Sequence, residues 1–267
     1  MVLIAVNGGL MLIRRIVWLL AGLVLSASAM GEYKPDPEAL VKDLERLTRS
    51  HDRMTLVLWL PTEFWRASLE SEGKMAPRDV DRFVKELEPF VVVAVADGQV
   101  GMLGSINFAE PESLRSAVTI EDSEGELFSA LPDTEISTGV RNLTQMMRPV
   151  LGNMMGALGT HIAFLVFPGV DKGSHPTIKP TKEGAFVVHV GPVAMRYRLP
   201  LGSLLPPMID AKSGESFPGN YHFNPYTGVK LSPAPAGAAQ PALTPASEPS
   251  RPEQPTTEPV PHSSTQG

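Results

Sequence analysis

The stretch FVVVAVADGQVGMLGSINF, residues 90–108, decides the fold class. Its first seven residues form a nearly continuous apolar run, which is typical of a buried strand. Asp97-Gly98 follows the run, and this dipeptide is a strong signal for a two-residue hairpin turn. The stretch therefore predicts two antiparallel strands, at 90–96 and 100–108, that reverse direction at Asp97-Gly98.

More strands are predicted on either side of this hairpin. The apolar runs MTLVLWL and HIAFLVF, residues 54–60 and 161–167, have the length and composition of buried strands. Two further hairpins are predicted by short β-like runs around turn residues, namely 117–122 with 126–129 and 185–190 with 194–199.

Four helices are predicted from apolar residues at spacings of three and four, at 36–53, from Pro61-Thr62 onward, at 77–87 and at 136–158. The last is rich in methionine and contains Pro149, at which we expect a bend. Methionine at helical spacing favours an adaptable core, and a Cu(I)-binding surface is the alternative.

The order of these elements shows no regular strand–helix–strand alternation. It predicts an α+β fold, with a mainly antiparallel sheet covered by helices on one side, over residues 32–205. A segment of this length is sufficient to bury one hydrophobic core. Residues 201–207, LGSLLPP, are interpreted as a connector to a small C-terminal unit.

The N-terminal residues have the pattern of a secretory signal peptide. Arg14 and Arg15 supply the positive charge, residues 16–25 the apolar segment, and Ala27-Ser28-Ala29 the small residues that signal peptidase prefers. We therefore expect residues 1–29 to be a signal peptide and the protein to be exported, to the periplasm or beyond the cell.

Retention as a membrane anchor is the alternative to cleavage. Even when extended through the small residues to Met30, the apolar run is only about 15 residues long, whereas a spanning helix needs about 20. No stable membrane span is therefore expected once the signal is removed. Either Met1 or Met11 is the initiator, because the first ten residues carry no charge.

The chain has no cysteine, which excludes disulfides, thiol catalysis and thiolate metal sites. Without the signal peptide it has 21 basic and 29 acidic residues, a net charge of −8. Nucleic-acid binding is therefore not expected, because it depends on clustered Lys and Arg.

The composition changes from Ser232 to the C-terminus, where 36 residues contain nine prolines and almost no large apolar side chain. Such a segment buries too little surface to offset the entropy of ordering it. Residues 232–267 are therefore predicted to be a disordered tail with polyproline II character, either a passive solubilising tail or a spacer that binds a partner.

Catalytic motifs are weak in this sequence. No GxSxG elbow, HExxH motif or histidine pair at metal-ligand spacing is present, and no cofactor is expected. Carboxylates are abundant, but acid–base catalysis needs an environment that shifts their pKa, and a sequence does not show one.

Two short segments are candidates for ligand binding. Trp65 and Arg66 follow a buried strand and are predicted either to form the rim of a pocket or to pack on the sheet. Arg196 and Arg198 are predicted to share one face of the last strand, with Tyr197 on the other, where they could bind a carboxylate or an anionic glycan. A solvated charged face is the alternative.

The C-terminal unit, residues 208–231, contains two similar turns. They read Asp210-Ala-Lys-Ser213-Gly214 and Asn224-Pro225-Tyr226-Thr227-Gly228, with about ten residues between them. Over residues 210–231 this rhythm resembles the zinc-ribbon or zinc-knuckle family, in which cysteines bind structural zinc. A Gly/Pro-rich hairpin that matches by chance is the alternative.

Here Asp210, Ser213, Asn224 and Thr227 occupy the positions that the resemblance assigns to cysteine. Such oxygen ligands would hold zinc very weakly, so no metal is expected. These residue types do accept hydrogen bonds from backbone N–H groups two or three residues ahead. We therefore expect them to act as structural caps around a small apolar core of Phe217, Tyr221, Phe223 and Tyr226.

Together these patterns predict an exported, non-enzymatic protein that binds an envelope protein or a glycan. The alternative is a periplasmic hydrolase or glycan-processing enzyme that uses carboxylates which the sequence does not identify. A deep cleft with convergent acids, or a His–acid pair, favours the enzyme. A shallow surface rich in aromatic residues or arginine favours binding.

Overall fold

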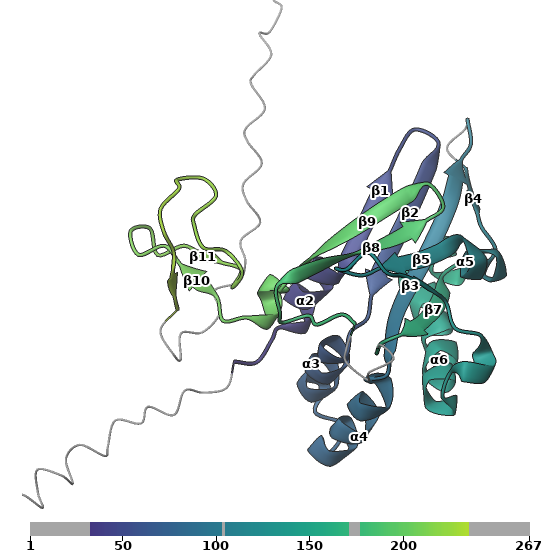
Figure 1. Ribbon diagram of the computed structural model, residues 1–267, viewed down its shortest axis with the longest axis horizontal. Helices are drawn as coiled ribbons and strands as arrows, with labels where there is room; N and C mark the ends of the chain where they lie inside the picture. Colours follow the sequence, from purple (N-terminus) through teal and green to yellow (C-terminus); the bar gives the residue numbers. More distant parts are fainter. Residues whose placement is uncertain (1–32, 103–104, 171–176, 235–267) are drawn as a thin grey trace, which may run out of the picture.

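The computed structural model describes residues 33–102, 105–170 and 177–234. Helices and antiparallel strands build an α+β domain, and a small unit of short strands follows it (Figure 1). The predicted signal peptide, residues 1–29, and nearly all of the predicted tail lie outside the described residues.

The first sheet is built around the long strand β3 (Phe90–Val100). On one side β3 pairs with β2 (Arg53–Trp59), which pairs in turn with β1 (Glu45–Arg49). On the other side it pairs first with β7 (Ala163–Pro168) and then with β4 (Ile106–Phe108). All of these pairings are antiparallel.

A second antiparallel sheet has the order β6-β5-β8-β9. Its strands are β5 (Val118–Glu121), β6 (Leu127–Ser129), β8 (Gly184–Val190) and β9 (Val193–Leu199). These strands are the two hairpins that the turn signals predict. The sequence does not reveal that they form a separate sheet, and the prediction of one sheet is therefore wrong in this respect.

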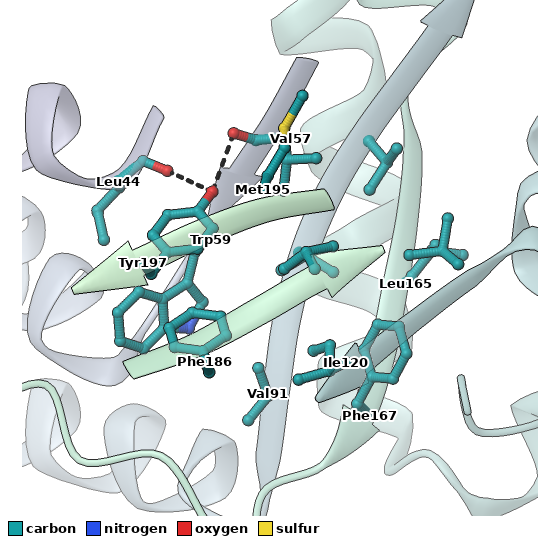
Figure 2. Close-up of a cluster of buried hydrophobic side chains, with 14 of the residues drawn as sticks. Leu44, Val57, Trp59, Val91, Ile120, Leu165, Phe167, Phe186, Met195 and Tyr197 are labelled. Carbon is teal, nitrogen blue, oxygen red and sulfur yellow. Dashed lines mark hydrogen bonds between the residues drawn. The ribbon is translucent and has the colours of Figure 1, made fainter. Parts of the chain in front are cut away.

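The two sheets pack face to face, because alternate residues of each are apolar and buried. Trp59 of β2 lies against Phe186 and Tyr197 of the second sheet, with ring centroids 4.7 and 5.9 Å away, as Figure 2 shows. The Tyr197 hydroxyl donates to the carbonyl oxygens of Leu44 and Val57, over 3.0 and 3.2 Å. Burial raises the pKa of Tyr197, so the hydroxyl keeps the proton that it donates.

Helices cover the other face of the first sheet (Figure 1). α3 (Thr62–Glu72) and α4 (Pro77–Leu87) begin within a residue of their predicted positions, and α6 (Thr138–Met155) contains Pro149. Met147 of α6 packs against the apolar cluster on this face, whereas Met146 is exposed. Two short helices, α5 (Pro111–Ala117) and α7 (Ala157–Thr160), were not predicted separately.

The helix predicted at 36–53 is half as long in the structure. α2 (Pro37–Leu44) ends where β1 begins, and β1 pairs with β2 along its whole length. Leu47, which lies at helical spacing from Leu40 and Leu44 in the predicted helix, is 53% exposed on this edge strand. Pairing with β2 stabilises residues 45–49 as a strand more than their helix propensity stabilises another helical turn.

The turn predicted at Asp97-Gly98 is also wrong, because β3 continues through both residues and the reversal comes after Gly101. Asp97 is buried, and its carboxylate accepts hydrogen bonds from Arg53 (2.7 and 2.8 Å) and Thr55 (2.7 Å). Gly98 lies under β4, where a Cβ atom would meet the Ile106 side chain at 2.6 Å.

The C-terminal unit forms its own antiparallel sheet of β10 (Met208–Ile209), β11 (Ser216–Phe217) and β12 (Ser232–Pro233), with β10 in the middle. Ser232 and Pro233, which the composition assigned to the tail, therefore belong to this unit. The unit lies beside α2 and away from the helical layer, as Figure 1 shows.

Candidate functional site

The first turn of the C-terminal unit is closed around Asp210. Its carboxylate oxygen Oδ1 accepts the backbone N–H groups of Lys212 (2.8 Å) and Ser213 (3.4 Å). The backbone of Asp210 bonds to Gly214 and Glu215, over 2.8 and 2.9 Å. Ser213 Oγ accepts the N–H of Glu215 (3.2 Å), so one carboxylate and one hydroxyl hold this turn.

The second turn repeats this arrangement around Asn224. Its Oδ1 accepts the backbone N–H groups of Tyr226 (2.9 Å) and Thr227 (3.2 Å). Its backbone bonds to Gly228 and Val229, both over 2.8 Å, and Thr227 Oγ1 accepts the Val229 N–H over 3.4 Å. The equivalent glycines, Gly214 and Gly228, have φ of +73° and +71°, which a side chain would strain.

One side-chain hydrogen bond joins the two turns. Asn224 Nδ2 donates to Asp210 Oδ2 over 2.8 Å, and the two residues are only 3% and 2% exposed. The bonds from the Asn224 amide and the Lys212 N–H lower the pKa of Asp210, against the effect of burial. The ionised carboxylate therefore accepts three donors at the centre of the unit.

This centre does not fit a zinc ion. Both carboxylate oxygens of Asp210 already accept N–H groups, and the Asn224 atom that faces Asp210 is an amide nitrogen, which has no lone pair to give a metal. Within residues 33–102, 105–170 and 177–234, no group of three or more His, Asp or Glu side chains is placed to hold a metal ion.

The aromatic residues of the unit do not form the core that the sequence suggested. Only Phe217 is buried, and Leu231 supplies the other buried apolar side chain. Tyr221, Phe223 and Tyr226 are 40, 58 and 71% exposed, and they are the only exposed aromatic side chains in the described parts of the chain. We call these three residues, which lie within the six-residue segment 221–226, the aromatic face.

The small size of the C-terminal unit explains why these three aromatic side chains are exposed. A folded segment of under 30 residues has an interior too small for four aromatic rings, and the Asp210–Asn224 pair already occupies its centre. The sequence did carry a signal for exposure, since Tyr221, Phe223 and Tyr226 alternate with Asn, His and Pro in a hairpin of turn residues.

The unit is fixed to the main domain through the connector. Gly219 N donates to the carbonyl of Gly202 (3.1 Å), and Asn220 Nδ2 donates to that of Pro200 (3.0 Å). At the other end of the unit, Ala234 N donates to Pro207 O over 3.0 Å. The aromatic face is therefore carried on a unit that Gly219 and Asn220 bond to residues 202 and 200.

A cleft of about 510 Å³ lies between α2 and the C-terminal unit. Three acids line it, Asp36, Glu38 and Asp43, and the two aspartates each have a structural role. Asp36 caps α2 by accepting the Glu38 N–H (3.1 Å), and Asp43 Oδ2 accepts the N–H and hydroxyl of Ser203 (2.9 and 2.8 Å). The two aspartates therefore do not form a catalytic pair with each other.

The side chain of Trp65 does not form a pocket rim, which corrects that interpretation. It is 7% exposed and packs edge-to-face with Phe64 and Phe83 beneath the first sheet. Arg66 instead faces solvent and forms ion pairs with Asp81 (2.6 Å) and Glu70 (3.6 Å). The structure thus separates the two residues, and the packing alternative describes Trp65.

Arg196 and Arg198 lie on the outer face of the second sheet, with Tyr197 buried beneath them. Neither guanidinium has an ion-pair partner among the described residues. The same face carries a pair that the sequence did not predict, in which His189 Nε2 lies 2.8 Å from Glu121 Oε2. Strand register brings these two together, and register is not visible in a single sequence.

No helix in the described parts of the chain is both long and apolar enough to cross a membrane. Comparison with protein-family models, with curated proteins and with solved structures returns no match. The geometry of the sites is therefore what bears on function.

Proposed function

We propose that this protein is a non-enzymatic interaction protein whose binding surface is the aromatic face. The observation that carries the proposal is the exposure of Tyr221, Phe223 and Tyr226 on a unit whose interior is occupied by polar caps. Large exposed apolar side chains on one small unit favour an interaction site, and aromatic residues are enriched in the energetic centres of interfaces.

In this proposal the C-terminal unit is a metal-free counterpart of the zinc ribbon. Asp210 and Asn224 accept the N–H groups that zinc-bound thiolates accept in the turns of that family, which supports the relationship. The hydrogen bond between the two residues takes the place of the metal as the link between the turns.

The partner is an envelope protein or a glycan, because we propose that residues 1–29 direct the chain out of the cytosol. The acidic mature chain, with its net charge of −8, supports a partner other than nucleic acid. Planar aromatic side chains beside hydrogen-bonding groups suit both the apolar faces of sugars and the side chains of a protein partner.

The experiment is capture of partners from the native envelope by the purified protein. The test variant combines Tyr221→Ala, Phe223→Ala and Tyr226→Ala. The control combines Leu47→Ala, Leu127→Ala and Met146→Ala, three residues of similar exposure (53, 63 and 67%) on other elements. Solubilised envelope proteins and isolated cell-wall glycan are tested separately, so that the class of partner is identified.

We expect the test variant to lose the partners and the control variant to keep them. If both variants capture the same partners as the unmodified protein, the aromatic face is not the binding surface. Circular dichroism of each variant shows whether a loss comes from unfolding instead.

A hydrolase remains the second candidate, and the His189–Glu121 pair is the observation that favours it. The pair lies on an open sheet face with side chains 31 and 40% exposed, and neither residue lines the cleft beside α2. A change in hydrolysis of envelope glycans or ester substrates after His189→Ala would support the enzyme. Unchanged turnover would exclude this pair as its catalytic group.

A further inference from the structure

The chain leaves the C-terminal unit soon after Lys230, the bridge partner of Phe223 in the aromatic face. β12 ends at Pro233, and Ala234 is held to Pro207 by a backbone hydrogen bond of 3.0 Å. The 33 residues that follow, 235–267, are therefore tethered to the unit that carries Tyr221, Phe223 and Tyr226. A tethered segment has an effective concentration in the millimolar range toward a site within its reach.

The composition of this tail matches an aromatic surface. Pro249, Pro252 and Pro255 recur every three residues in the segment PSRPEQP. A polyproline II helix has three residues per turn, so these prolines form one ridge along it. Such ridges bind to surfaces lined by exposed aromatic rings, at a low entropy cost because the helix is already extended.

The charges of the tail and of Lys230 in the C-terminal unit are also complementary. Glu248, Glu253 and Glu258 make residues 235–267 acidic, against one arginine, Arg251. On the aromatic face, Lys230 is the cross-strand partner of Phe223, and both residues are exposed. Partners in such a bridge project to the same side, so Lys230 and Phe223 point to one side of the unit.

The geometry of the tether permits contact within one chain. Fourteen residues separate Ala234 from the first proline of the ridge, Pro249. A flexible linker of that length spans roughly 20 Å. A folded unit of this size is itself about 20 Å across, so the ridge can reach any part of the unit's surface.

We infer that residues 249–255 bind the aromatic face of their own chain as a polyproline II segment. This inference rests on the proposed function, because a tail in this position competes with the partner for the same rings. The tail then regulates the interaction, since the partner must displace a ligand that is always present at high local concentration.

Zero-length carbodiimide cross-linking of the purified protein, with its tail, tests this arrangement. The reagent joins a lysine to a carboxylate that it contacts, and the diagnostic product joins Lys230 to Glu253. Electrophoresis separates links within one chain from links between two chains, and mass spectrometry identifies the linked peptides. Glu253→Gln confirms the assignment by removing the product.

We expect the link within the monomer. It should be lost when Tyr221, Phe223 and Tyr226 are all changed to Ala, and also after the combined changes Pro249→Ala, Pro252→Ala and Pro255→Ala. The matched control, with Pro241, Pro245 and Pro261 changed to Ala, should keep it, because those prolines lie outside the ridge.

Three results overturn the inference: no Lys230–Glu253 link, a link found only between two chains, or a link that persists without the three aromatic rings. Partner capture separates this failure from failure of the proposed function. An absent link with capture that still depends on the aromatic face refutes only the role of the tail. A link that is present, with capture independent of those rings, refutes only the proposed function.

Discussion

Asn224 Nδ2 lies 2.8 Å from Asp210 Oδ2, and this hydrogen bond joins two turns that are 14 residues apart in the sequence. Both residues are buried, and each also accepts the N–H groups of its own turn. The pair thus combines the local role of a turn cap with the long-range role of a cross-link.

Asn224→Ala should therefore open the C-terminal unit while the main domain stays folded. The change removes the cross-link and two backbone caps, and it leaves the Asp210 carboxylate with one donor fewer. We expect a loss of about 1–3 kcal/mol in the local free energy of opening. Amide hydrogen exchange measures it, through faster exchange at residues 210–231 than in β2, β3 and β8.

Thr227→Val is the matched control for this change. It removes a single acceptor, whose bond to Val229 N is long at 3.4 Å, and it should have a much smaller effect. Equal protection in the Asn224→Ala and unmodified proteins would show that the cross-link does not stabilise the unit.

Acid should loosen the C-terminal unit through Asp210. Its pKa is lowered in the folded protein, chiefly by the bond from Asn224. The carboxylate's contribution is therefore complete above the ordinary carboxyl pKa and is lost as the pH falls through the lower folded value. Amide exchange or NMR line shapes of residues 210–231 should show the loss, and Asp210→Asn should reduce its dependence on pH. If the loss of protection in acid is unchanged in the Asp210→Asn variant, a group other than Asp210 causes it.

Tyr197→Phe should destabilise the main domain by about 1–2 kcal/mol, because it leaves two buried carbonyl oxygens without their donor. Those carbonyls belong to Leu44 and Val57, on elements that the hydroxyl connects. Tyr221→Phe is the control, since this ring is 40% exposed, and its effect should stay within about 0.5 kcal/mol. Urea unfolding of both variants measures the difference. Similar urea midpoints for the two variants would show that the Tyr197 hydroxyl does not stabilise the domain.

The Arg53–Asp97 ion pair should be strongly coupled. Asp97→Ala and Arg53→Ala should each cost about 2–4 kcal/mol, because each leaves a partly buried charge without its partner. The double variant should cost less than the sum of the two, which a double-mutant cycle in urea detects. The hydrogen bond to Asp97 raises the pKa of Arg53, so this coupling should be constant across neutral pH. Additive effects would contradict it.

The antiparallel α+β fold could be predicted from the sequence because its strands are long apolar runs and two of its hairpins have clear turn residues. Asp97-Gly98 misled for a physical reason. Turn propensity is a local property, whereas Arg53 and Thr55, which hold Asp97 in a strand, lie more than 40 residues away. The strand β1 was missed for the same reason, because its conformation depends on pairing with β2 and not on local propensity.

The candidate site could be predicted only in part. The caps of the C-terminal unit follow from local residue types, and the sequence placed Asp210, Ser213, Asn224 and Thr227 at the positions where the structure has the turn hydrogen bonds. The exposure of Tyr221, Phe223 and Tyr226 depends instead on how much interior the unit has. The buried state of Trp65 depends in the same way on the packing of α3 against α4.

The hydroxyl of Tyr197 and the carboxylate of Asp43 also constrain the order of events during synthesis. Tyr197 bonds to Leu44 across 153 residues, and Asp43 bonds to Ser203 across 160. The first helix of the domain is therefore completed by nearly its last residues. A chain that emerges from its N-terminus cannot close this domain until residue 203 is free, so folding is completed late, after most of the chain has been synthesised.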